Sequence, residues 1–415
     1  MKNQVSSEQA QGVGSGGDDT PVKMSRAELR ASLWLASLYA IRMLGLFLVM
    51  PVFALHASTL PGGEDVFWVG VAFGVYGLTQ ALLQIPYGAA SDRFGRKPVI
   101  TTGLLVMCAG SIVAAMADSV WMLGVGRAVQ GAGAVSAAIS ALVADSTRDE
   151  NRSKAMALIG VMIALSYAAS LVIGPLLYER LGLAGMFWFT GGLALIAIVV
   201  LWKCVPDVPK PARVARGPLG EVMDADLWRL NLGIFVLHLT QMALFVVLPA
   251  RLLLAGVPVG DHWRLYLPVV AAGFLLMLVP MRMAERGGRM KSVFLGGVLV
   301  VAMAQAGFAI LPADVGLWPL AALLLLFFAG FSLLEALLPS LVSRLAPVIS
   351  RGLALGIYST SQSLGIFAGG ALGGFLLKHL GEKGIFITSL LLLMLWFGLA
   401  RSARRWPGSV TPPRS

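Results

Sequence analysis

The stretch Gly88-Ala89-Ala90-Ser91-Asp92-Arg93-Phe94-Gly95-Arg96-Lys97 is a dense cluster of charge and glycine between two long apolar runs, at about 66–90 and 98–117. Each run is long enough to cross the ~30 Å hydrocarbon core of a membrane. Because the connection is so short, we expect two antiparallel neighbouring spans. Gly95 permits a sharp reversal that a residue with a Cβ would resist. Basic residues in short loops mark the cytoplasmic side, so we expect this loop to be cytoplasmic.

The composition predicts that most of the chain is embedded in a membrane. The sequence is 57% hydrophobic and only 13% charged, with a mean hydropathy of +0.81, whereas a soluble protein carries about 25% charged residues. The net charge of +11 could indicate nucleic-acid binding. However, the Lys and Arg residues gather in segments expected on one side of the membrane, which is the asymmetry of inner-membrane proteins. We therefore expect no nucleic-acid partner, and contact of the basic face with anionic lipid.

Two cysteines, Cys108 and Cys204, lie inside or beside apolar runs and belong to no Cys/His cluster. The sequence therefore predicts neither a disulfide framework nor a metal site, and we expect no cofactor.

Apolar runs predict an all-α membrane protein with twelve transmembrane helices in two six-helix bundles. The expected domains are a disordered cytoplasmic tail (1–29), a first bundle (30–204), a Pro-rich linker (205–228), a second bundle (229–401) and a tail (402–415), with both termini cytoplasmic. The expected spans lie near 31–55, 66–90, 98–117, 121–144, 155–178, 184–204, 229–254, 263–284, 293–311, 316–343, 351–377 and 383–401.

The two halves also repeat. Leu181-Gly182-x-x-Gly185-x-Phe187 recurs as Leu380-Gly381-x-x-Gly384-x-Phe386. Such an internal repeat over six spans is typical of secondary transporters.

The glycine and charge pattern of the opening stretch resembles the signature loop between spans 2 and 3 of the major facilitator superfamily, and every fixed position is present. Within that family, Ile41-Arg42-Met43-Leu44-Gly45, Glu335-Ala336-Leu337-Leu338-Pro339-Ser340-Leu341 and Tyr358-Ser359-Thr360-Ser361-Gln362 resemble the YajR type of bacterial drug–proton antiporters. Some relatives of that type carry an extra soluble C-terminal domain. We expect this chain to lack it, because the sequence ends at Ser415.

The resemblance implies two pseudo-symmetric bundles and a conformational latch. In such a latch, Asp92 would cap the cytoplasmic start of span 11 and Arg96 would reach Asp145 at the end of span 4. The simpler alternative is a positively charged anchor loop without a latch. The expected latch residues are Gly88, Asp92, Arg93, Gly95, Arg96, Lys97 and Asp145.

Four ionisable residues stand out inside predicted spans: Arg42, Arg127, His238 and Glu335, in spans 1, 4, 7 and 10. Each costs at least ~2.5 kcal/mol to insert, so each needs an explanation. In the resembled fold these four spans line a central cavity, which makes the four residues candidates for proton coupling. Glu335 leads because it is a lone carboxylate deep in a span, where Arg42 or His238 would hold its ionised form. The structural alternative is a charge that pairs without touching substrate, notably for Arg127 and His238.

Polar-tipped side chains in the spans are candidates for a substrate pocket, although each could equally be a hydrogen-bond partner between helices. The candidates are Tyr39, Tyr76, Gln80, Gln84, Tyr167, Gln241, Tyr358 and Gln362. Because few charges are embedded, the pattern favours an amphiphilic cargo over a sugar or a multiply charged metabolite.

These features predict a proton-coupled transporter of the bacterial inner membrane, a monomer that exports small amphiphilic compounds or drugs. Gly174-Pro175 resembles the antiporter motif of drug exporters, but Leu176-Leu177-Tyr178 departs from it, so a transporter of a specific metabolite stays open. A transport-inactive sensor or a membrane enzyme is disfavoured, since the sequence shows no nucleophile–base set, metal cluster or phosphate loop.

Overall fold

The computed structural model describes residues 24–207, 224–286, 288–347, 350–403 and 406. Within them the protein is helical, without a strand. The elements are α1 (Arg26–Phe47), α2 (Phe53–Ala57), α3 (Val66–Phe94), α4 (Arg96–Ala115), α5 (Val120–Ala132), α6 (Ser136–Asp145), α7 (Asp149–Cys204), α8 (Ala225–Leu254), the 3₁₀ turn η2 (Val259–Asp261), α9 (His262–Arg286), α10 (Met290–Ile310), α11 (Leu317–Leu345) and α12 (Arg351–Arg401).

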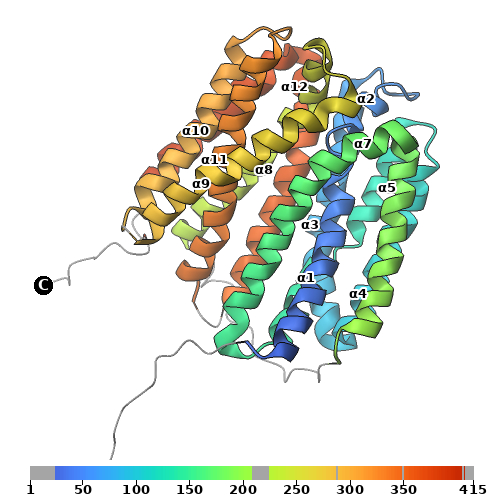
Figure 1. The fold of residues 1–415 in the computed structure, drawn as a ribbon, viewed down its shortest axis with the longest axis vertical. Coiled ribbons are helices and arrows are strands. Elements are labelled where there is room, and N and C mark those ends of the chain that lie inside the picture. The colour runs from blue at the N-terminus through green and yellow to red at the C-terminus, as the bar shows by residue number, and fades with distance from the viewer. Residues whose placement is uncertain (1–23, 208–223, 287, 348–349, 404–405, 407–415) are drawn as a thin grey trace, which may run out of the picture.

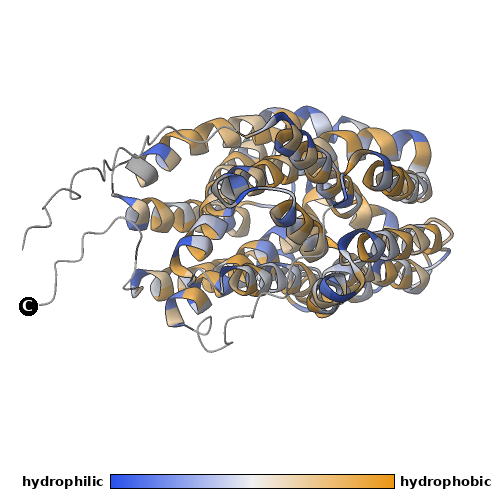
Figure 2. Cartoon of the chain, turned by 90° about the horizontal axis from the view of Figure 1, so that it is seen from below, coloured by the Kyte–Doolittle hydropathy of each residue, from blue (hydrophilic) through white to orange (hydrophobic). Residues whose placement is uncertain are grey.

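The long helices run roughly side by side (Figure 1), with α1–α7 forming one half of the molecule and α8–α12 the other. Seen from below, the helices are largely hydrophobic (Figure 2). Among the described residues, nine helices are long and apolar enough to cross a membrane. Two of these, α7 and α12, are interrupted by a residue with non-helical backbone angles. The all-helical fold is therefore confirmed, while the count of twelve spans stays a prediction.

The repeated glycine motif marks the reversal inside both long helices. Gly182 in α7 has φ 64°, and Gly381 in α12 has φ 68°. L-residues with a side chain rarely adopt a positive φ, so glycine is the residue that allows each helix to turn back here. The repeat seen in the sequence thus places the same turn in each half.

The opening stretch is far less of a loop than predicted. Helix α3 continues to Phe94 and α4 begins at Arg96, which leaves Gly95, with φ 100°, as the single residue between them. Gly88, Asp92 and Arg93 therefore lie in the last turns of α3. The short polar residues of this stretch tolerate helix, and a basic residue in the last turn complements the helix dipole.

Two predicted spans are broken. The first ends as α1 at Phe47 and resumes as the short α2 at Phe53. Pro51 lies between them, and proline removes a backbone donor and clashes with the preceding turn. The fourth span divides into α5 and α6 around Gly133, where an added Cβ would lie 2.4 Å from the carbonyl oxygen of Gly103. This close approach to α4 explains the small residues there.

The predicted linker and both predicted tails fall largely on 208–223, 1–23 and 407–415, outside the described residues. The division into domains therefore stays a prediction.

Candidate functional site

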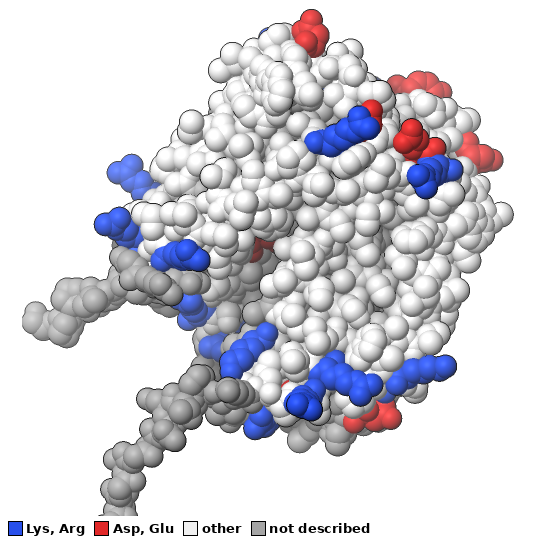
Figure 3. All heavy atoms as spheres, viewed as in Figure 1, with Lys and Arg blue, Asp and Glu red and all other residues white. Residues whose placement is uncertain are grey.

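A cleft separates the two halves at one end of the molecule. Figure 3 shows it opening toward the end where Lys and Arg residues gather, with acidic atoms visible at its inner end. We call this the basic end; it includes Arg96, Lys97 and Lys291. The other end, which we call the far end, is closed by contacts between the halves.

Closure of the far end rests on backbone packing between α3 and α12. A Cβ added to Gly70 would lie 2.3 Å from the carbonyl oxygen of Gly370, and one added to Gly74 would lie 2.7 Å from that of Phe367. Glycine on both helices allows this approach. One ion pair adds to it, since Lys378 Nζ lies 2.7 Å from Asp65 Oδ2.

An aromatic layer joins the halves at mid-depth. Tyr167 of α7 lies with its ring 5.0 Å from that of Phe47, and 6.2 and 6.0 Å from those of Phe328 and Phe331 in α11. The His238 ring meets Phe331 edge-on at 5.6 Å. These ring contacts join α1 and α7 of the first half to α8 and α11 of the second.

Glu335, His238 and Gln362 form a polar cluster one turn below this layer. They come from α11, α8 and α12, the three helices that surround this part of the second half. Gln362 Nε2 lies 3.1 Å from Glu335 Oε1 and 2.9 Å from His238 Nε2. His238 Nε2 lies 3.8 Å from Glu335 Oε2. The Glu335 side chain keeps 30% of its surface exposed although it lies in mid-helix, because the cleft reaches it.

The hydrogen bonds define the protonation of His238. Its Nδ1 lies 3.2 Å from the carbonyl oxygen of Ile234, which can only accept, so Nδ1 carries the hydrogen. Its Nε2 then accepts one N–H of Gln362, which donates its other N–H to Glu335. This arrangement fits a neutral imidazole. It leaves Glu335 Oε2 buried without a hydrogen-bond partner among the described residues, at a position where an added proton would reduce an uncompensated charge.

Of the two partners expected for Glu335, Arg42 and His238, this state shows His238 beside it. His238 and Gln362 are the neighbours of Glu335, whereas all three guanidinium nitrogens of Arg42 are buried without a hydrogen-bond partner among the described residues. Arg42 is 1% exposed.

Arg127 is held entirely by the first half. Its Nη1 donates to Gln130 Oε1 at 3.0 Å, and its guanidinium lies over the Tyr76 ring at 4.7 Å. Gln130 in turn donates to Ser111 Oγ at 2.7 Å. These contacts support a structural role, and the predicted place of Arg127 in the coupling set stays a prediction.

Of the predicted pocket residues, Gln362 is the one that joins the cluster. Tyr76 instead packs under Arg127. The others are buried, and several of their polar atoms lack partners among the described residues. This group consists of Tyr39, Gln80, Gln84, Tyr167, Gln241 and Tyr358.

The expected contact between Arg96 and Asp145 is present, and its role in a latch stays a prediction. Arg96 Nε lies 2.8 Å from Asp145 Oδ2, and its Nη1 lies 2.5 Å from Asp92 Oδ1. Lys97 donates to the carbonyl oxygen of Val205 at 2.7 Å. Arg96 thus ties the end of α3 to the end of α6. The expected cap of Asp92 on span 11 concerns a helix start preceded by 348–349, outside the described residues, and stays a prediction.

A second basic-end pair was not anticipated. Arg148 binds Glu28 through Nε at 2.9 Å and Nη2 at 3.0 Å. These hydrogen bonds hold the pKa of the Glu28 carboxyl well below its usual range. Together with the capping box that Glu28 forms with Ser25, they anchor the start of α1.

Sequence reasoning also missed Arg251 and Glu382, whose Nε and Oε2 lie 2.7 Å apart. Arg251 is buried, and its guanidinium lies 4.7 Å above the Phe386 ring. Arg251 falls near the end of a predicted span, where a charge is taken for a loop residue. The pairing across 131 positions leaves no local signal in the sequence.

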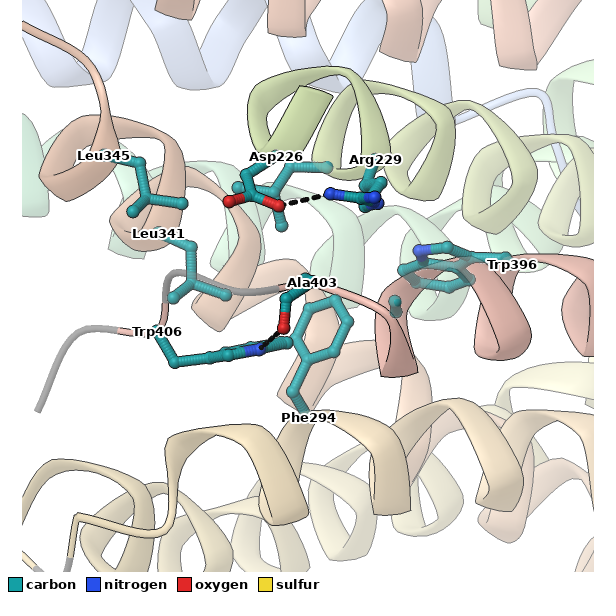
Figure 4. A pocket seen from close by; sticks show the side chains of 10 residues that line it. Asp226, Arg229, Phe294, Leu341, Leu345, Trp396, Ala403 and Trp406 are labelled. Atoms are coloured by element: carbon teal, nitrogen blue, oxygen red, sulfur yellow. Dashed lines mark hydrogen bonds and ion pairs between the residues drawn. The ribbon is translucent and has the colours of Figure 1, made fainter. Parts of the chain in front are cut away.

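A small cavity of about 10 Å³ lies at the basic end of the second half, away from Glu335. Figure 4 shows Trp406 and Phe294 closing it, with Asp226 and Arg229 paired at its edge. It has room for roughly one water molecule, so it is not a substrate pocket.

Comparisons with known proteins agree with this geometry. Residues 35–348 match the family model of the Major Facilitator Superfamily. The chain is 39% identical over 391 residues to "Inner membrane transport protein YajR" of Escherichia coli (strain K12), covering 93% of this chain and 86% of that protein. It is 30% identical to "Multidrug resistance protein MdtH" of Yersinia pestis (strain Pestoides F), covering 80% and 81%.

Among solved structures, a bacterial homologue of the human lysosomal transporter Spinster, in an inward-facing and occupied conformation, superposes with a TM-score of 0.71. The match covers 91% of this chain and 97% of that one at 14% identity, and it shows that the fold is shared.

Proposed function

This chain belongs to the major facilitator superfamily, and from that premise we propose that it exports small amphiphilic compounds from bacteria in exchange for protons. Its relatives are named as an inner membrane transport protein and a multidrug resistance protein, which supports export across the inner membrane. The chain would work as a monomer, by alternating access of the cleft to the two sides.

The distribution of charge supports an orientation. Lys and Arg gather at the basic end (Figure 3), and basic segments stay on the cytoplasmic side. We therefore place the basic end, and with it both termini, in the cytoplasm. The structure then corresponds to the inward-facing state, with the far end closed toward the periplasm.

The polar cluster of Glu335, His238 and Gln362 is the observation that carries the proposal. A coupling group must favour one facing state over the other according to its charge. When ionised, Glu335 receives one hydrogen bond from Gln362, which also donates to His238. When protonated on Oε2, it would no longer need that support, so its tie to α8 and α12 would loosen. Uptake of a proton thus changes how firmly three helices of the second half are held together.

Arg96 is proposed as the latch at the basic end. Its contacts with Asp92 and Asp145 keep the ends of α3 and α6 together as one unit. When the basic end closes, Asp92 would meet the start of α12, where free backbone N–H groups favour an anion.

The test is flux in proteoliposomes with a panel of amphiphilic dyes and an imposed pH gradient. We expect dye movement against the proton gradient that an uncoupler abolishes. Glu335→Gln keeps the shape and hydrogen bonding of the protonated acid, so it should still move dye down its own gradient and lose acceleration by the pH gradient. Arg264→Gln, a charge loss at an exposed periplasmic position, is the control and should respond as wild type does.

A wild-type pH response in Glu335→Gln would show that Glu335 is structural, with His238 as the next candidate. If no dye moves while a specific metabolite shows counterflow, the alternative of a metabolite transporter replaces drug export.

A further inference from the structure

Three arginines are fully buried in the described part of the chain: Arg42, Arg127 and Arg251. Arg251 is paired with Glu382. Arg127 donates a hydrogen bond to Gln130, and its guanidinium lies over the Tyr76 ring. Arg42 differs from both. Its Nε, Nη1 and Nη2 are all buried without a hydrogen-bond partner among the described residues, and the ion pairs there do not include it.

This situation is unfavourable for an arginine. The guanidinium stays protonated in proteins, so it cannot escape its charge as a lysine or a histidine can. A buried charge is stable when it is paired and hydrogen-bonded. The Oε1 atoms of Gln80 and Gln84 also lack partners, but amide oxygens are neutral and do not balance a charge. An anion would both balance the charge of Arg42 and accept its hydrogen bonds.

Arg42 lies at the depth of the transport cleft. It precedes Phe47 of the aromatic layer by five positions, which places it about 7.5 Å nearer the basic end. Glu335 lies four positions from Phe331 of the same layer, or about 6 Å nearer the basic end. Both therefore lie one turn below the aromatic layer, Arg42 in the first half and Glu335 in the second.

The carboxylate of Glu335 is not that anion in this state, because its contacts are with Gln362 and His238 in its own half. We propose that Arg42 binds an anionic group that enters through the cleft, and that the cargo is an amphiphilic anion such as an aromatic or aliphatic carboxylate or sulfonate. This inference rests on the proposed function.

The surroundings suit such a molecule. A carboxylate or sulfonate accepts hydrogen bonds from the fork of the guanidinium, while the rings of Phe47, Tyr167 and Phe331 would cover an apolar body. Arg42 is buried in this state, and its long side chain has enough rotatable bonds to turn toward the cleft when an anion arrives. A free inorganic anion could bind Arg42 through the same hydrogen bonds, so the experiment must distinguish it from an anionic group on the cargo.

The experiment measures equilibrium binding to the purified full chain, without any gradient. The anionic probe is the fluorescent anilinonaphthalene sulfonate, and the cationic probe is tetraphenylphosphonium. The variants are Arg42→Met, which removes the charge at similar length, Arg42→Lys, which keeps a point charge, and the control Arg264→Gln, whose side chain is 68% exposed.

We expect Arg42→Met to weaken binding of the sulfonate about tenfold or more, the effect of losing one charge-assisted pair. Arg42→Lys should recover part of that loss, and Arg264→Gln should bind as wild type does. Phosphonium binding should not weaken in Arg42→Met. Wild-type affinity for the sulfonate in a folded Arg42→Met protein would overturn the proposal. So would a preference of the wild type itself for phosphonium, which needs no variant to fold.

Competition with chloride shows whether the anion that binds Arg42 can be inorganic or must belong to the cargo. If chloride weakens sulfonate binding in the wild type and not in Arg42→Met, an inorganic anion also fills the site; if it has no effect, the site is reserved for the group on the cargo. Because no gradient is applied, failure of proton coupling would leave these results unchanged, whereas loss of the Arg42 dependence would leave a test of proton coupling intact.

Discussion

The two ends of the molecule are built differently. At the far end, the halves meet through backbone against backbone, with Gly70 against Gly370 and the ion pair Lys378–Asp65 at the rim. At the basic end, the strong polar contacts of the first half brace that half internally, through Arg96–Asp145 and Arg148–Glu28. Close packing between the halves thus lies at one end, and charge that stiffens one half lies at the other.

The difference indicates how such a molecule can change state. Close backbone contacts at glycines are lost as soon as the helices separate. The far end is therefore either closed or open, without stable intermediate positions. The charged pairs at the basic end can move with their half as a rigid unit. Substitutions should therefore have their largest effects where the halves meet closely and smaller effects at exposed ion pairs.

The largest effect is expected from Gly70→Val. Two branches of a side chain cannot fit where even a Cβ would lie 2.3 Å from a carbonyl oxygen. Over-packing costs about 1–3 kcal/mol, so the population closed at the far end should fall about 5- to 150-fold. Dye flux in proteoliposomes should fall accordingly.

Gly296→Val is the matched control, because a Cβ there meets nothing within 4 Å. Equal flux in the two variants would show that the α3–α12 crossing does not govern the change of state.

Asp92→Asn should have the next largest effect. It removes the charge that binds Arg96 and that is expected to cap α12 in the other state. We expect normal insertion and flux reduced tenfold or more, which corresponds to ~1.4 kcal/mol on the conformational equilibrium or barrier. Full activity of Asp92→Asn would leave the loop as a charged anchor only.

Lys378→Gln should act weakly. The ion pair with Asp65 lies at the surface, and such pairs contribute about 0–1 kcal/mol, so flux should change by no more than about fivefold. A loss as large as that of Gly70→Val would show that the ion pair, and not the packing, holds the far end closed.

The smallest effect on closure of the far end is expected from lowering the pH so that Asp65 becomes protonated. The hydrogen bond from Lys378 lowers the pKa of Asp65 from its ordinary value of 3.8. A group with a lowered pKa stabilises the bridged state above its ordinary pKa and loses that contribution as the pH falls through the lowered one. Closure of the far end should therefore be insensitive to Asp65 at neutral pH and weaken only in strong acid. Asp65→Asn should remove this acid dependence when spin-label distances are followed across the far end.

The sequence predicted those features that depend on residues close to one another along the chain. Apolar runs predicted the helices, and the repeat predicted equivalent turns, which prove to be at Gly182 and Gly381. Glu335 was found because a carboxylate within an apolar run is anomalous by itself. The short loop was overestimated, because charge and glycine were taken to end a helix that in fact continues to Phe94.

What was missed depends on contacts between distant residues. Nothing near Arg251 in the sequence indicates Glu382 as its partner. For Glu335 the sequence left Arg42 and His238 open as partners and did not indicate Gln362. The break around Gly133 depended on how closely this residue approaches α4. Such pairings follow from tertiary packing, which a single sequence does not display.

The central claim is that protonation of Glu335 shifts the balance between closure of the far end and closure of the basic end. It is tested most directly by pulsed electron spin resonance distances on a background without Cys108 and Cys204. One label pair spans the basic end at Leu29 and Arg344, and another spans the far end at Thr59 and Ile310, all exposed positions. The wild-type distances should shift in opposite directions at the two ends between neutral and acidic pH, while Glu335→Gln should show one pH-independent distribution. A pH-dependent shift of wild-type size in Glu335→Gln would show that protonation of Glu335 does not set the balance between the two closed ends.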